Sequence, residues 1–339
     1  MKLKQMRSPM QDYALTKDEL SAIRAISEQH HISIGELASI LRISNAWASR
    51  ISKRLEEKGI VKKKRHGISK SVEIVDREHA QLLAEMIRAE PYIPWEKVLS
   101  YSNMAVLLAN TTGERDFQRG LSNVTTWRKL RNLAAHGLVP KTGNKSNLNL
   151  KLSQFVQAYA DFISKKFARE ALPQKAIIIW GRGYSYFFKL RKKELKGEEE
   201  QIKISEKKFL KTALTAFPRY GIQFIMDDLY YYYEPGVKKL SLEEIILHTL
   251  LIDRGSQTYM GYALLLLFKK TKSIDFQILR ERSKRYDLLE TVENIIRFVD
   301  SKGEFHPWPL PKWKELGEQA NKYGIEIENA NREKRRILT

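Results

Sequence analysis

The chain has 339 residues, of which 42% are hydrophobic. That length favours two or three domains, and that composition excludes an intrinsically disordered chain. Sixty Lys and Arg against forty Asp and Glu give a net charge of +20, which indicates a polyanionic partner. The absence of cysteine excludes disulfides and thiolate metal sites, and no apolar run approaches the ~20 residues that span a bilayer. We therefore expect a cytoplasmic protein without a membrane partner.

Residues 1–89 carry the pattern of a winged helix-turn-helix domain. Two capping boxes, Thr16-x-x-Glu19 and Ser33-x-x-Glu36, each predict the start of a helix. A third helix is predicted over residues 45–58, and two strands are predicted over 60–64 and 72–75. The apolar residues of the third helix that face the first two are Ala48, Ile51 and Leu55.

This order of three helices and a hairpin, over residues 14–76, resembles the MarR-like winged-helix regulators of bacteria and archaea. The resemblance implies a recognition helix in the major groove and a wing beside it. Asn and Arg are the side chains that pair with adenine and guanine edges. Trp47 could instead flank the core. The candidate DNA contacts of the helix and the wing are Ser44, Asn45, Trp47, Ser49, Arg50, Lys53, Arg54, Lys62, Lys63, Lys64, Arg65, His66 and Lys70.

Residues 122–139 repeat residues 44–61, with six identities in eighteen aligned positions. Basic charge gathers at both copies, because residues 42–70 carry +8 and residues 123–151 carry +6. We therefore predict a second winged-helix domain over 90–172. Its predicted elements are an apolar helix over 95–108, a short helix over 114–121, a recognition helix over 123–136 with Leu130 and Leu133 inward, a wing tip at 141–145 and a closing helix over 152–169.

The candidate contacts of the second copy are Asn123, Thr125, Arg128, Arg131, Asn132, Lys141 and Lys145. Lys129 aligns with the core residue Ile51, so the inward face must shift by one position. The second copy could for this reason bind a partner protein instead of DNA.

Residues 173–339 predict an α/β domain with a helical C-terminal half. A buried strand is expected over 175–181 and a second strand over 222–226. Helices are expected over 242–252, 260–268, 275–286 and 288–299, with a Pro- and Trp-rich loop after them. Four consecutive tyrosines, Tyr230–Tyr233, favour an edge strand or interface with outward hydroxyls over a base-stacking surface.

The segment 241–255 with the helices after it resembles nucleotidyltransferase-like proteins of the abortive-infection type. The resemblance implies two carboxylates on one strand face and a serine near phosphate, Ser185 here. Asp227 and Asp228 are the only catalytic alternative, and adjacent residues of a strand point to opposite faces. We therefore expect an inactive relative that serves as a sensor or dimerisation domain.

Taken together, the sequence predicts a mixed α+β, mainly helical chain with two tandem winged helix-turn-helix domains. We expect a transcriptional regulator that binds double-stranded DNA as a homodimer, without an identified effector. The seven histidines show no ligand spacing, so no metal and no cofactor are predicted. Two alternatives stay open: a nucleotidyltransferase that holds nucleic acid with its winged helices, and a protein that coats DNA without reading its sequence.

Overall fold

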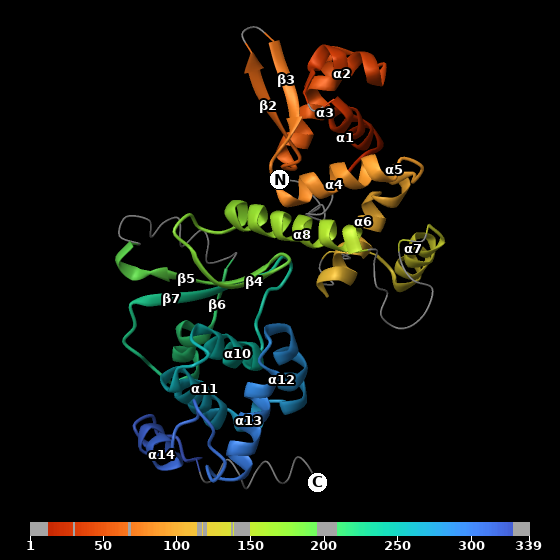
Figure 1. Cartoon of the computed structure of the whole chain (residues 1–339). Helices are drawn as coiled ribbons and strands as arrows, with labels where there is room; N and C mark the ends of the chain where they lie inside the picture. The colour runs from red at the N-terminus through yellow and green to blue at the C-terminus, as the bar shows by residue number, and fades with distance from the viewer. Residues whose placement is uncertain are drawn as a thin grey trace. The chain divides into compact units, whose positions relative to one another are not determined.

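The computed structural model describes residues 13–29, 31–66, 69–113, 117, 121–136, 138, 150–194 and 209–327. The chain divides into two compact units, Met1–Glu170 and Ala171–Thr339, whose elements are labelled in Figure 1. None of the helices in the described ranges has the length and apolar character that crossing a membrane requires.

The first unit is mainly helical and contains one small sheet. Its elements are α1 Lys17–Gln29, β1 Ile32–Ser33, α2 Ile34–Leu41, α3 Asn45–Glu57, β2 Val61–His66, β3 Ser69–Ile74, α4 Glu78–Ala89, α5 Trp95–Val98, α6 Tyr101–Thr112, α7 Asn123–Ala135 and α8 Leu150–Ala171. The first six form the predicted winged helix, and both predicted capping boxes are present.

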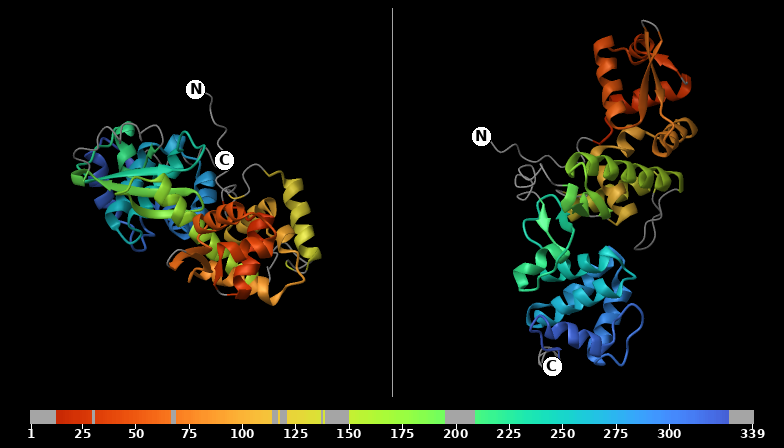
Figure 2. Two further views of the ribbon diagram at one scale, coloured as in Figure 1. Left: turned by 90° about the horizontal axis from the view of Figure 1, so that it is seen from above. Right: turned by 90° about the vertical axis from the view of Figure 1, so that its left-hand side faces the viewer.

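The three helices of the winged helix close over an apolar core because each presents one buried stripe. The inward residues of α3, Ala48, Ile51 and Leu55, are fully buried, as predicted from their spacing. The sheet has the order β1-β3-β2 and is antiparallel. Strand β1 pairs with β3 and was not predicted, since two residues are too few for a recognisable pattern. Figures 1 and 2 show the β2–β3 hairpin pointing away from α8.

A buried ion pair ties the end of the winged-helix core to its beginning. The Lys58 ammonium group, just after α3, lies 2.7 Å from a carboxylate oxygen of Glu19 on α1. Both side chains are almost completely buried. Removing one partner of such a pair leaves an uncompensated buried charge, so the pair fixes α3 against α1.

The rest of the first unit departs from the predicted second winged helix. The helix predicted over 95–108 is two helices, because Ser100 is extended, with ψ 155°, between α5 and α6. No strand occurs in the described part of residues 90–171. The wing tip at 141–145 and most of the short helix at 114–121 lie outside the described residues.

Helix α8 packs against the C-terminal end of α3. Gly59 has φ +67°, and a Cβ there would lie 2.4 Å from the Phe162 ring. The Phe162 ring also stacks on His79, with ring centroids 4.5 Å apart. The Tyr159 hydroxyl donates to the Tyr13 carbonyl at 2.7 Å. A glycine is therefore required just after α3 ends.

The second unit combines an antiparallel sheet with a helical bundle. Its elements are β4 Ile177–Arg182, β5 Ser185–Arg191, η3 Lys192–Glu194, β6 Leu210–Lys211, η4 Ala213–Tyr220, β7 Asp228–Tyr233, α10 Leu242–Ile252, α11 Gln257–Lys269, η5 Thr271–Ser273, α12 Phe276–Ser283, η6 Lys284–Tyr286, α13 Leu289–Asp300 and α14 Trp313–Asn321. Its core joins residues of β5, β7, α10, α11 and α13, and in Figure 1 the helices lie on one side of the sheet.

Several predictions for the second unit are wrong in detail. The sheet, of order β4-β5-β7-β6, is wholly antiparallel, so the arrangement is α+β and not α/β. Residues 222–226 form no strand. Strand β4, predicted as buried, is an edge strand on which Ile178 is 47% exposed. Helix α14 lies where a loop was expected.

The four tyrosines form β7, an inner strand, and all four are buried. Side chains alternate between the two faces of a strand, so Tyr230 and Tyr232 face the helical core. The Tyr232 hydroxyl donates to Glu234 inside the unit. The prediction of an edge strand with outward hydroxyls is therefore wrong, and burial also removes these rings from any base-stacking role.

Candidate nucleic-acid interface

Helix α3 has one buried face and one exposed face of polar and basic residues. Ser44 caps the helix by accepting from the Trp47 amide at 3.2 Å. The helix carries no acid before Glu56. The exposed candidates on and before the helix are Ser44, Asn45, Ser49, Arg50, Lys53 and Arg54. This arrangement places amide, hydroxyl and guanidinium groups on the side that a recognition helix turns to DNA.

The basic side chains on the exposed face of α3 form no ion pairs with acids among the described residues. Arg50 and Lys53 form no ion pair with any acid among the described residues. Arg54 lies over the Trp47 ring, 5.2 Å from its centroid. The Trp47 indole N–H donates to Asp18 on α1 at 3.1 Å. Trp47 thus flanks the core and supports Arg54.

The wing contains one acidic residue, Glu73, whose carboxylate contacts three basic side chains. Glu73 on β3 pairs with Lys62 opposite it, and with Lys64, at 2.8 Å each. His31 Nδ1 lies 2.8 Å from the other oxygen of the same carboxylate. The two ammonium groups lower the pKa of Glu73 to about 2. Glu73 therefore stays ionised and offsets one wing charge at any ordinary pH.

Glu73 is not among the residues predicted from the sequence, although it lies only three positions beyond the basic segment. The cross-strand register Lys62↔Glu73 would have revealed it once the hairpin turn was placed. Of the other wing candidates, Lys63 lies 3.6 Å from Glu56, and Lys70 is exposed. The side chains of Arg65 and His66 lie outside the described part of the chain.

Helix α7 repeats the local geometry of α3. Both helices span thirteen residues and begin with a serine cap, Ser122 accepting from the Thr125 amide at 3.1 Å. Both end in the same turn, since Leu138 N donates to Leu133 O as Ile60 N donates to Leu55 O. The repeated sequence therefore encodes a repeated helix and stop.

The second set of candidates is exposed but packs less firmly. Arg128 forms no ion pair with a described acid, and Arg131 lies 5.4 Å from the Trp127 ring centroid. Asn123 and Asn132 are exposed, whereas Thr125 is half-buried. Within α7 only Leu133 is fully buried, and Leu130 is half-buried. Lys141 and Lys145 lie outside the described residues.

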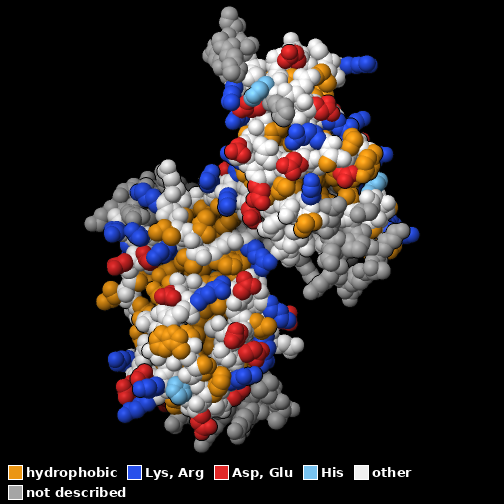
Figure 3. All heavy atoms as spheres, viewed as in Figure 1, with side chains coloured by type: hydrophobic (Ala, Val, Ile, Leu, Met, Phe, Trp, Pro, Cys, Tyr) orange, Lys and Arg blue, Asp and Glu red, His pale blue; other side chains and the backbone are white. Residues whose placement is uncertain are grey.

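The charged surface of the first unit is not uniformly basic. On the face drawn in Figure 3, Lys and Arg side chains lie between Asp and Glu side chains. Unpaired basic groups include those on the outward faces of α3 and α7, where Arg50 and Arg128 occupy aligned positions, and others such as Arg42 and Lys97 lie elsewhere in this unit. The aligned placement of Arg50 and Arg128, more than the net charge of the surface, distinguishes α3 and α7.

The alternative catalytic residues of the second unit do not form a metal site. Asp228 lies 2.6 Å from the Lys189 ammonium group, and Asp227 is exposed beside it. No group of three or more potential metal ligands occurs among the described residues. Ser185, expected near phosphate, is fully buried and accepts from Arg285 at 2.8 Å.

His248 belongs to the same buried region of the second unit. It lies between Thr212 and Tyr286, with Nδ1 2.7 Å from the threonine hydroxyl and Nε2 3.0 Å from the tyrosine hydroxyl. Burial lowers the pKa of His248 to about 3. The imidazole is therefore neutral at ordinary pH and acts as a hydrogen-bonded core residue.

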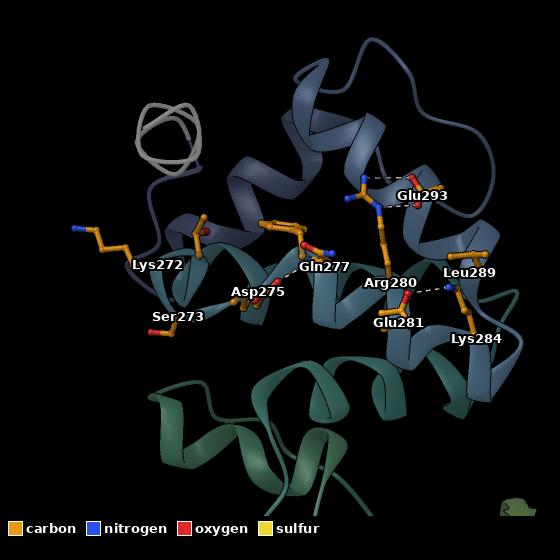
Figure 4. A pocket seen from close by; sticks show the side chains of 12 residues that line it. Lys272, Ser273, Asp275, Gln277, Arg280, Glu281, Lys284, Leu289 and Glu293 are labelled. Atoms are coloured by element: carbon orange, nitrogen blue, oxygen red, sulfur yellow. Dashed lines mark hydrogen bonds and ion pairs between the residues drawn. The ribbon is translucent and has the colours of Figure 1, made fainter. Parts of the chain in front are cut away.

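A hollow of about 820 Å³ lies along α12 and the start of α13. Figure 4 shows that its charged groups face one another: Arg280 pairs with Glu293 at 2.7 Å and Lys284 with Glu281 at 2.9 Å. Asp275 accepts from two backbone amides at the start of α12. Of these interactions, the Arg280–Glu293 pair joins α12 to α13, whereas the other two lie within α12 and the residues that flank it.

Comparison with known proteins agrees with the geometry of the first helices and wing. Residues 15–67 match the model of the MarR family. The N-terminal region is MarR-like. The matched segment is thus similar to a family of winged-helix transcriptional regulators. Residues 206–325 match a second family model, described as HVO_2833_C, C-terminal. No curated protein and no solved structure matches the chain.

Proposed function

We propose that this protein is a transcriptional regulator that recognises a defined duplex DNA sequence with α3 and the β2–β3 wing. The observation that carries the proposal is the outward face of α3, where Asn45, Ser49 and Arg50 are exposed and Arg50 has no acidic partner among the described residues. These groups match base edges of the major groove, and the lysines of the hairpin match phosphates.

Within this proposal, the second copy of the repeat and the second unit have roles of their own. Helix α7 supplies a second helix face with Asn123, Arg128 and Arg131, and the second unit provides dimerisation or the response to an effector. Dimerisation follows from the need to place recognition helices on two half-sites. The other candidate contacts of both copies, apart from Trp47, act on phosphates and sugars, and thereby set the register on the duplex.

Replacing Arg50 by alanine tests the proposal. We expect Arg50→Ala to weaken binding to a selected duplex by about 1–3 kcal/mol and to relax the preference at one base pair. Arg169→Ala removes the same charge from an exposed position near the end of α8 and serves as the matched control.

Affinity is measured by fluorescence anisotropy with competitor DNA, using the region upstream of the protein's own coding sequence and duplexes selected from random sequence. Equal affinity of the wild-type protein for all duplexes would show a coating protein and would overturn the proposal. Equal losses of affinity in Arg50→Ala and Arg169→Ala would also overturn the proposal, because they would show that Arg50 contributes only its charge and contacts no base.

A further inference from the structure

The first turns of α7 expose two large apolar side chains. Val124 is 58% exposed and Trp127 is 59% exposed. They lie three positions apart, so they share one face of the helix. In α3 the aligned positions hold Ala46 and Ser49, which are small. The two repeated helices thus differ in the chemistry that they present at the same place.

The surroundings of this pair identify its partner. Helix α7 carries Arg128, Lys129 and Arg131 and no acid. A second α7 on this face would bring like charges together, which opposes self-association through it. The Arg131 guanidinium group lies over the Trp127 ring, 5.4 Å from its centroid. An apolar pair within a cationic helix face fits a polyanion that also displays apolar groups.

The major groove of DNA offers one apolar group on its base edges, the C5-methyl group of thymine. Recognition helices contact base edges with their N-terminal residues, and Val124 and Trp127 are the second and fifth residues of α7. We propose that Val124 and Trp127 form a thymine-methyl-reading surface, which makes α7 specific for thymine-containing half-sites. This inference rests on the proposed function, since it requires that the protein binds duplex DNA.

The test removes only the methyl groups. A duplex selected from random sequence by the full chain is synthesised again with deoxyuridine in place of every thymine, and both probes are titrated with the full chain. We expect the wild-type protein to bind the uracil duplex about four-fold more weakly for each methyl group that is contacted. The double variant Val124→Ala with Trp127→Ala should bind both duplexes equally.

Tyr92→Ala is the matched control, because Tyr92 is 78% exposed and lies outside α7. This variant should keep the wild-type preference for thymine. Equal binding of the two probes by the wild-type protein overturns the inference, as does a preference that survives in the double variant. Sedimentation velocity measures the oligomeric state of the double variant. If this variant loses a dimer but keeps the thymine preference, the face contacts protein and the inference is overturned. Failure of the proposed function differs, since the wild-type protein would then select no duplex.

Discussion

Glu73 pairs with two wing lysines, Lys62 and Lys64, and its removal should strengthen the proposed DNA binding. Glu73→Gln leaves a side chain of the same size and raises the net charge of the group Lys62, Lys64 and Glu73 from +1 to +2. A carboxylate about 8 Å from a phosphate repels it by about 2 kcal/mol at an effective dielectric constant of ~20, and salt screening reduces this to about 1 kcal/mol. We therefore expect about five-fold tighter binding.

The assay is fluorescence anisotropy with a selected duplex at fixed ionic strength. Glu85→Gln is the control, because Glu85 is an exposed acid of α4 with no ion pair to a described residue, so it changes the total charge equally. If Glu73→Gln weakens binding while the fold is intact, Glu73 positions the lysines for phosphate contact and the argument from charge competition is refuted. An increase that Glu85→Gln reproduces would refute it as well.

Two predictions concern stability. Gly59→Ala should lower the free energy of unfolding by about 2–4 kcal/mol in urea titrations, because a Cβ at φ +67° would lie 2.4 Å from the Phe162 ring. Gly35→Ala is the control and should leave the free energy of unfolding unchanged, because a Cβ there would lie 4.0 Å from its nearest neighbour. Equal effects of the two substitutions would contradict the close packing at Gly59. Burial lowers the pKa of His79 to about 4, so only the unfolded chain takes up this proton between pH 6.5 and 4. Stability should fall by about 3 kcal/mol over that range as pH decreases, and a His79→Gln variant that kept the full slope would show that another group titrates.

Helix α3 was predictable because its signals are local. The serine cap, the spacing of Ala48, Ile51 and Leu55, and the glycine stop all lie within one turn or a few turns of one another. The family match over 15–67 agrees with that analysis. The partners of the wing lysines were not predictable in the same way, because Glu73 meets Lys62 across a hairpin, and pairing depends on register.

The second unit shows the corresponding limit for strands. An apolar run such as 177–180 predicts a strand, but does not say whether the strand is central or at an edge. Its place was fixed by pairing: β4 has one neighbour, whereas β7 lies between β5 and β6. The four tyrosines were assigned the wrong position for that reason, since a strand buried on both faces carries no alternation in its sequence.

The pairing of the wing lysines with Glu73 affects how DNA binding should depend on salt concentration. If about eight cations of the two helices and wings met phosphate, the logarithm of affinity would fall with the logarithm of salt at a slope near −7. Lys62 and Lys64 share one carboxylate, and Lys63 lies 3.6 Å from Glu56. Fewer cations are then available, so the wild-type slope should be shallower than −7. In Glu73→Gln it should steepen by about 1 to 2. An unchanged slope in that variant would mean that the wing lysines do not reach phosphates, and that α3 and α7 carry the electrostatic part of binding.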